Sequence, residues 1–177
     1  MISQNAVKTI LFLAIFILMV GISKSQTAGN FKLISSAFEE GKPIPAKYTC
    51  DSTNVSPPLS WSGSPEKTKS FAIIMDDPDA PMDNWVHWVM YNIPVTVTSL
   101  EEKASAAKIN AIDGLNNWDE KGYNGPCPPD GTHHYNFTLY ALDKTLIPKE
   151  VMTKPALLEA MKGHILSEST LTGMFRD

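Results

Sequence analysis

The stretch from Val86 to Ile93 constrains the fold of this chain more than any other. It is rich in β-branched and aromatic residues, and apolar side chains occupy both alternating sets of positions along it. Strict alternation places Val86, Trp88 and Met90 on one face and His87, Val89, Tyr91 and Ile93 on the other. A strand that is apolar on both faces has to be covered on both sides. The sequence therefore predicts a strand in the middle of a layered β structure.

Other segments extend this β pattern. Three further runs rich in β-branched and aromatic residues and bounded by turn formers predict strands, at residues 31–36, 70–75 and 135–142. One helix is expected to start near Thr153, because Pro155 suits a first helical turn and Gly163 can end the helix. Residues 166–175 resemble a strand, whereas residues 101–112 are compatible with helix or strand. Pro-rich loops at 54–61, 77–81 and 124–131 fall inside a single unit. The predicted fold is mainly β with a few peripheral helices.

The N-terminal segment has the pattern of an export signal. Residues 9–21 form an apolar run of about 11–13 residues, shorter than the roughly 20 that span a bilayer, and small residues follow at Ser23 and Ser25. We expect residues 1–25 to be a signal peptide and residues 26–177 to be one domain without a transmembrane span, periplasmic or secreted. An uncleaved N-terminal anchor is the alternative. Removal of residues 1–25 takes away Lys8 and Lys24 and no acid, so the formal net charge falls from −4 to −6. This acidic balance argues against nucleic-acid binding.

Export changes the interpretation of the two cysteines. Outside a reducing compartment, Cys50 and Cys127 would tend to oxidise, and both lie beside turn-forming residues. A bridge between them would close a loop of about 78 residues, worth roughly 4.5 kcal/mol in the chain-entropy account. We expect a disulfide, with two separate thiols as the alternative.

An acidic motif, Asp76-Asp77-Pro78-Asp79-Ala80-Pro81, directly follows a predicted strand. Its two prolines restrict the backbone and hold the carboxylates on a stiff loop at a strand end, where binding groups commonly lie. The alternative is an ordinary solvated turn, because Asp and Pro are common turn residues.

Two further motifs carry histidine. His87 lies between Trp85 and Trp88, and a lone histidine in an apolar strand is more often a core residue with satisfied hydrogen bonds. In Gly131-Thr132-His133-His134-Tyr135, a strand would place His133 and Tyr135 on one face and His134 on the other.

Together these motifs resemble the phosphatidylethanolamine-binding protein family, in particular its bacterial Raf-kinase-inhibitor-like (YbhB/YbcL) branch. The matching segments, in chain order, are Asn54 to Trp61 (NVSPPLSW), Asp77 to Pro81 (DPDAP), His87-Trp88, Gly125 to Pro129 (GPCPP), Gly131 to Tyr135 (GTHHY) and Tyr140 to Asp143 (YALD). The resemblance implies an antiparallel two-sheet fold, with a large sheet packed on a smaller one, and a small preformed anion pocket. The pocket residues carry over to Asp77, Pro81, His87, His133 and Tyr135, and Asp79 of the same loop joins them as a candidate. Where the family usually has Arg after the histidine of the last motif, this chain has His134, and the link from that motif to the acidic loop is left open.

Three functions are compatible with these residues. The resemblance implies a binding module, not an enzyme and without a cofactor, that takes a small anion or a phospholipid head group and modulates a protein partner. A zwitterionic head suits two aspartates and two histidines better than a bare phosphate, and anion binding is expected to strengthen as the pH falls through about 6.5. The first alternative is an inhibitor of serine proteases or kinases. The second is a metal-dependent hydrolase that uses Asp77, Asp79, His87 and His133 as ligands.

Overall fold

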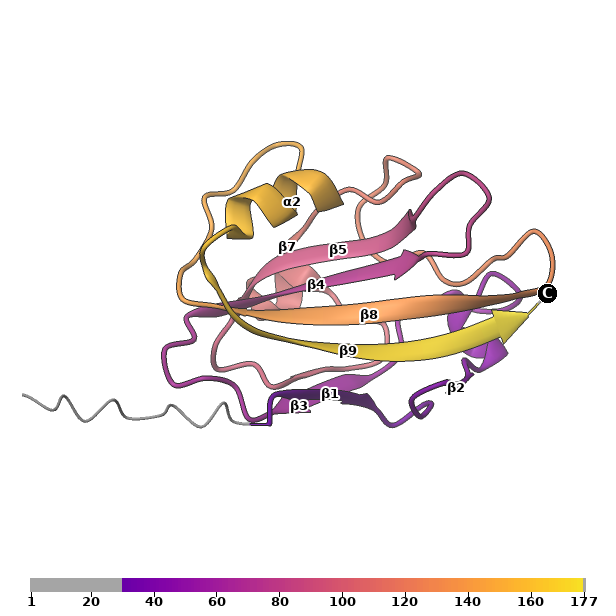
Figure 1. The fold of residues 1–177 in the computed structure, drawn as a ribbon, viewed down its shortest axis with the longest axis horizontal. Helices are drawn as coiled ribbons and strands as arrows, with labels where there is room; N and C mark the ends of the chain where they lie inside the picture. The colour runs from indigo at the N-terminus through magenta and orange to yellow at the C-terminus, as the bar shows by residue number, and fades with distance from the viewer. Residues whose placement is uncertain (1–29, 177) are drawn as a thin grey trace, which may run out of the picture.

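A computed structural model describes residues 30–176, and the predicted signal peptide lies outside the described residues. Two sheets make up most of the structure (Figure 1). The smaller sheet has the order β1-β3-β6, with β1 at Lys32–Ser35, β3 at Leu59–Ser62 and β6 at Ser99–Leu100. The larger sheet has the order β2-β9-β8-β4-β5-β7, with β2 at Lys42–Pro43, β9 at Ile165–Arg176, β8 at Thr132–Leu142, β4 at Ser70–Asp77, β5 at Trp85–Pro94 and β7 at Ile112–Asp113. All pairings are antiparallel except the short one between β2 and β9. The predicted mainly β, two-sheet fold is confirmed.

Short helical segments lie at the periphery of these sheets. Helix α2 spans Lys154–Met161, with Thr153 as its N-cap, Pro155 in its first turn and Gly163 in left-handed backbone (φ +76°) just beyond its end. Turns of 3-10 helix occur at Ala46–Tyr48 and Ala106–Ile109, so residues 101–112 hold a short helical turn rather than a regular helix or a long strand. None of the helices within residues 30–176 is long and apolar enough to cross a membrane.

Strands β4 and β5 of the larger sheet are buried on both faces, as the composition of residues 86–93 predicts. One apolar cluster lies between the sheets and joins Phe71, Ile73 and Met75 of β4 to Leu33 and Trp61 of the smaller sheet. A second cluster lies on the other face, where Ala72 and Ile74 of β4 meet Leu157 and Met161 of α2. The alternation along β4 therefore supplies both cores.

Strand β5 departs from simple alternation. Its register to β4 passes from Met75↔Trp88 to Asp76↔Val86, so His87 is an extra residue, a β-bulge. Val86 consequently packs on the α2 side of the sheet and not with Trp88, which corrects the predicted faces. A second irregularity, around Asn92 (φ +55°), returns Ile93 to the side between the sheets. Both corrections concern which way side chains point.

Candidate functional site

The predicted site residues come from three neighbouring strands at one end of the larger sheet and from the loop that follows β4. Because β4 is antiparallel to both β5 and β8, the end of β4 lies beside the starts of the other two, on the right in Figure 1. Asp77 is the last residue of β4, His87 is near the start of β5, and His133 and Tyr135 open β8. The loops that join these strands gather at the same end (Figure 1).

Asp77 is the buried acid of this site. Its Oδ2 lies 2.7 Å from Nδ1 of His133, and the two side chains are 5% and 8% exposed. Its other oxygen, Oδ1, accepts a hydrogen bond of 2.8 Å from the backbone N–H of Asp79. The carboxylate thus fixes the turn that follows β4 and holds the His133 ring in place.

The exposed face of β8 is joined to the acidic loop. Oδ2 of Asp79 accepts hydrogen bonds from the backbone N–H of His134 at 2.8 Å and from its ring Nδ1 at 2.7 Å. The His134 backbone N–H, and then its ring, hold the pKa of Asp79 below its usual range. Histidine at position 134 therefore links β8 to the acidic loop, although the family usually has arginine there.

His87 is positioned by its bulge. Its Nδ1 lies 2.9 Å from the carbonyl oxygen of Asn124 and 3.1 Å from that of Gly125. Carbonyls can only accept, so Nδ1 carries the hydrogen and Nε2 is the lone-pair nitrogen of the neutral ring. Burial lowers the pKa of His87, against the opposing effects of these carbonyls and of the Asp77 charge. The ring also lies edge-on to Tyr135 and to Trp118, with centroids 5.2 and 5.0 Å apart.

The hydroxyl of Tyr135 is the least satisfied polar group here. The side chain is fully buried, and its oxygen makes no hydrogen bond within the described part of the chain. The Cys127 backbone N–H and the Asp77 carboxylate lie close to it, but neither meets it in good hydrogen-bond geometry. Burial, with the Asp77 charge second, raises the pKa of Tyr135, so the group stays a phenol. A buried donor without a partner at such a site is a candidate ligand contact.

These residues border a cavity of about 380 Å³. Its lining residues are Asp77, Ala80, Pro81, Met82, Trp85, His87, Trp118, Cys127 and Pro129. Of the predicted site residues, Asp77, Pro81 and His87 line this cavity. His133, Asp79 and Tyr135 do not line it: His133 and Tyr135 support Asp77 and His87 from behind, and Asp79 faces solvent beside His134. A larger hollow of about 430 Å³ lies along residues 96–109, but it contains none of the predicted site residues.

Sequence reasoning missed the apolar half of the wall. Ala80 and Met82 flank Pro81, and Trp85 is two residues before His87, so their position in the chain could have signalled their role. Trp118 is 42% exposed and packs edge-on to Trp85, with ring centroids 5.3 Å apart. No local signal marks Trp118, because it reaches the site from a distant loop.

A disulfide between Cys50 and Cys127 ties down one wall of the cavity. The backbone N–H of Cys50 also donates to the Pro126 carbonyl at 3.0 Å, and that of Gly125 donates to Oδ1 of Asn54 at 2.8 Å. Gly125 has no room for a side chain, since a Cβ there would lie 2.3 Å from the Tyr48 carbonyl oxygen. The loop that holds His87 is therefore packed closely on the segment around Cys50.

The four residues suggested as metal ligands do not converge as a set. His87 directs Nδ1 at two carbonyls, His133 directs Nδ1 at Asp77, and Asp79 is turned toward His134. Within residues 30–176, no three His, Cys, Asp or Glu side chains are arranged to hold a metal ion.

Comparisons with known proteins agree with the fold. The family described as phosphatidylethanolamine-binding protein matches residues 34–176. Among curated proteins, the chain is similar to UPF0098 proteins of Methanothermobacter thermautotrophicus (48% identical) and Chlamydia muridarum (46% identical), each match covering 81% of this chain and 97% of the relative. Among solved structures, it is similar to CT736 of Chlamydia trachomatis, a putative phosphatidylethanolamine-binding protein homolog (TM-score 0.79, 45% identity, 83% of this chain and 97% of that one). It is also similar to E. coli YbcL, described as a member of the mammalian PEBP family (TM-score 0.76, 32% identity, 83% and 98%).

Proposed function

Because the chain belongs to the phosphatidylethanolamine-binding protein family, we propose that it binds a small phosphate-bearing group, free or as a phospholipid head, in the cavity between Asp77 and His87. The proposal is for binding without turnover. The observation that carries it is a pair of adjacent polar groups. His87 lines the cavity and has its Nδ1 anchored to carbonyls, which leaves Nε2 for a ligand, and the Tyr135 hydroxyl, on the ring behind His87, has no hydrogen-bond partner within the described residues.

The protonation state of His87 determines how an anion can bind in the cavity. A neutral His87 offers a lone pair at Nε2, which accepts a hydrogen from a protonated phosphate oxygen but repels a fully ionised one. A protonated His87 instead donates to any anion. The acids that act on this ring are Asp77, at the cavity wall, and the more distant Asp76, and both favour its protonation, as would a bound anion.

The sign of the pH dependence follows. Burial places the pKa of His87 below 6.5 in the free protein, and a bound anion raises it. Anion affinity should therefore increase as the pH falls from the raised pKa of His87 in the bound state to its pKa in the free protein, which lies below the value of 6.5 expected from the sequence alone. A phosphate monoester with an ammonium group, such as phosphoethanolamine, should bind better near neutral pH than inorganic phosphate, because its positive end offsets the charge of Asp77.

Calorimetry with sulfate, phosphate and phosphoethanolamine between about pH 5 and pH 8 tests this proposal. Sulfate keeps its charge over that range, so its pH dependence reports the protein alone. His87→Asn retains a donor toward the Asn124 carbonyl but removes Nε2, and it should weaken anion binding by roughly tenfold or more, the value of a hydrogen bond to a charged group. Sulfate affinity that is flat or rises with pH, or binding that His87→Asn leaves unchanged, would contradict the proposal.

We also propose that the protein is exported and that it acts on a protein partner. The apolar segment at residues 9–21 supports delivery to the periplasm or the medium, which cell fractionation would check. Inhibition of a serine protease or kinase is the way in which such a module would act on a partner. Assays against a panel of both enzyme classes, with the His87→Asn variant as control, would reveal whether inhibition depends on the cavity.

A further inference from the structure

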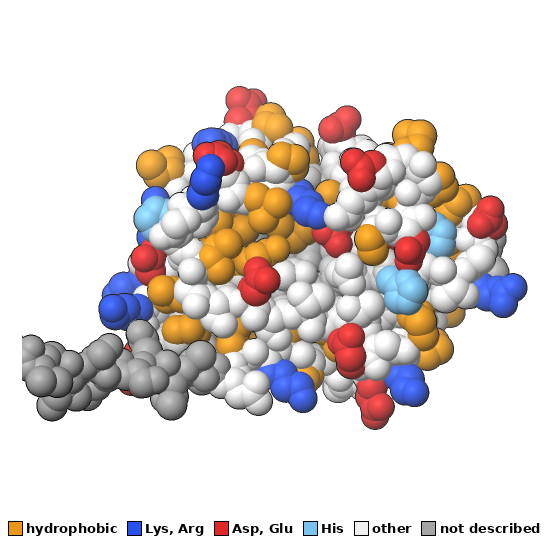
Figure 2. Space-filling view, in the orientation of Figure 1, with side chains coloured by type: hydrophobic (Ala, Val, Ile, Leu, Met, Phe, Trp, Pro, Cys, Tyr) orange, Lys and Arg blue, Asp and Glu red, His pale blue; other side chains and the backbone are white. Residues whose placement is uncertain are grey.

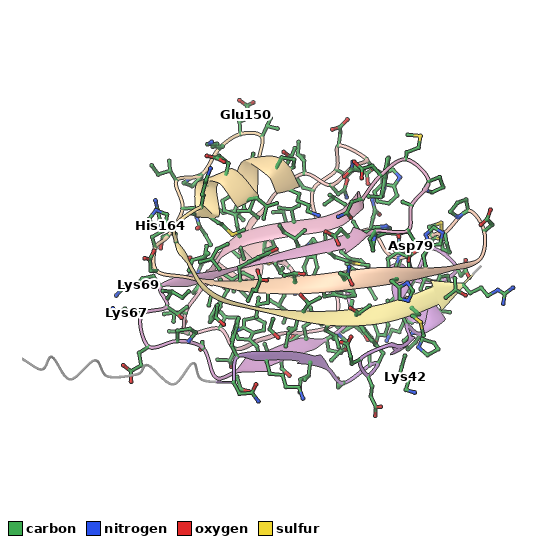
Figure 3. All side chains as sticks on the ribbon, in the orientation of Figure 1. Lys42, Lys67, Lys69, Asp79, Glu150 and His164 are labelled. Carbon is green, nitrogen blue, oxygen red and sulfur yellow. A yellow bond between two sulfur atoms is a disulfide. The ribbon has the colours of Figure 1, made fainter. Side chains whose placement is uncertain are left out.

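The wall of the cavity contains a methionine that solvent reaches freely. Met82, in the loop between β4 and β5, lines the cavity and is 77% exposed. Asp79, in the same loop, lies at the opposite end of the molecule from Lys67 and Lys69 (Figure 3). Figure 2 shows apolar side chains at the surface over the loops at this end, on the upper right. The thioether of Met82 is therefore part of the cavity wall and is also open to reagents in solution.

The other methionines within residues 30–176 are much less accessible. Four of them are no more than 1% exposed, namely Met75, Met90, Met152 and Met161. Met174, in β9, is partly buried. Oxidation of a sulfur side chain by a reagent in solution depends on its exposure. Exposure therefore separates Met82 from the remaining methionines of the described structure.

No thiol of this chain competes with that thioether. The chain has two cysteines, and a disulfide joins Cys50 to Cys127. A thiolate is the sulfur group that reacts most readily with an oxidant, and a disulfide has none. Among residues 30–176, Met82 is consequently the most accessible sulfur that a peroxide can oxidise.

We propose that Met82 is a site of reversible oxidation, at which conversion of the thioether to the sulfoxide weakens anion binding in the cavity. A peroxide supplies the oxygen atom: its O–O bond breaks, an S–O bond forms, the sulfur loses two electrons, and the reduced peroxide leaves as water. In the reverse step, an enzyme of the methionine sulfoxide reductase class uses two thiols as the reductant. The S–O bond breaks, the oxygen leaves as water, and the two thiols become a disulfide.

The change in polarity gives the sign of the effect on binding. The wall beside Met82 is largely apolar, with Ala80, Pro81, Trp118 and Pro129 among the lining residues. Apolar walls keep water away and strengthen the attraction between a bound anion and a charged partner. A sulfoxide is polar, and its oxygen accepts hydrogen bonds without donating any, so it brings water and the negative end of a dipole to this wall. Anion affinity should therefore fall. This effect rests on the proposed function, whereas the oxidation of Met82 does not.

Peptide mass mapping after treatment of the folded protein with dilute hydrogen peroxide tests the site. Met82 should gain one oxygen atom about tenfold faster, or more, than Met174 and the four buried methionines. Incubation with a methionine sulfoxide reductase and a dithiol should remove that oxygen. Equal rates at Met82 and Met174, or faster oxidation of a buried methionine, would overturn the inference.

Sulfate calorimetry at acidic pH, before and after oxidation, tests the effect on binding. Oxidation should weaken sulfate binding about fivefold or more in the unsubstituted protein and equally in Met174→Leu, the matched control, and the reductase should restore it. Met82→Leu has no sulfur at this position, so its affinity should be the same before and after both treatments. An equal loss in Met82→Leu, or unchanged affinity after complete oxidation of Met82, would contradict the inference. Absence of sulfate binding before treatment would instead refute the proposed function and the effect on binding with it, while the mass map still decides the oxidation site.

Discussion

Replacing Tyr135 with phenylalanine should stabilise the free protein. The hydroxyl is buried without a hydrogen-bond partner in the described structure, and a buried polar group in that state costs about 1–3 kcal/mol. Phenylalanine fills the same space without the oxygen, so the free energy of unfolding should rise by about 1 kcal/mol or more. For a chain of this size, 1 kcal/mol corresponds to an increase in Tm of about 2–4 °C.

The same substitution should weaken ligand binding. If the phenol donates a hydrogen bond to a bound phosphate, losing that bond to a charged group costs about 1.5–3 kcal/mol. This is a decrease in affinity of roughly tenfold to a hundredfold. A more stable protein with weaker binding is the expected signature of a polar group retained for a ligand.

Tyr91→Phe is the matched control. The Tyr91 hydroxyl is also buried and has no hydrogen-bond partner among the described residues, but its ring belongs to the apolar cluster beneath α2, on the other face of the sheet. Thermal unfolding should show stabilisation of both variants, and phosphate calorimetry should show a loss only for Tyr135→Phe. Destabilisation by Tyr135→Phe of more than about 1 kcal/mol would mean that the Cys127 backbone N–H or the Asp77 carboxylate satisfies the hydroxyl. Unchanged affinity would mean that the ligand does not reach the hydroxyl.

Three further outcomes follow from the same structure. Replacing Cys50 and Cys127 with serine should lower the free energy of unfolding by roughly 4.5 kcal/mol in the chain-entropy account, measured by urea titration, with an unchanged midpoint arguing against it. The free energy of unfolding should fall as the pH drops below about 6.5, because His87 becomes protonated there in the unfolded chain while burial keeps its pKa lower in the folded protein. The loss should level off below the folded-state pKa. His87→Asn should reduce the slope of the free energy of unfolding against pH. His134→Arg should change stability by less than about 1 kcal/mol in thermal unfolding, since an exposed pair with Asp79 contributes little whichever cation forms it, and a larger change would show that the histidine ring has a second role.

Local patterns predicted much of the fold. The runs that became β1, β4, β5 and β8 were recognised from β-branched and aromatic residues between turn formers, and Thr153 and Gly163 correctly bracketed α2. The two-residue strands β2, β6 and β7 were missed because so short a pairing leaves no periodicity to detect. β3, at Leu59–Ser62, was hidden by the prolines that precede it.

The candidate site was predicted in part. Asp77, Pro81 and His87 line the cavity as expected, whereas His133 and Tyr135 act from behind these residues. The bulge at His87 could not be read from the alternation of β5, because a bulge is defined only by the partner strand.

The sequence by itself determined the features that depend on residues close together in the chain. The two-residue period of β8 placed His133 and Tyr135 inward and His134 outward, and the prolines around Asp79 stiffened the loop that follows β4. Tertiary structure alone decided where His87 points and that Trp118 stands at the cavity mouth. The physical reason is that side-chain direction within a strand is set by local backbone geometry, whereas strand register and the meeting of distant loops are set by which surfaces the whole chain can bury together.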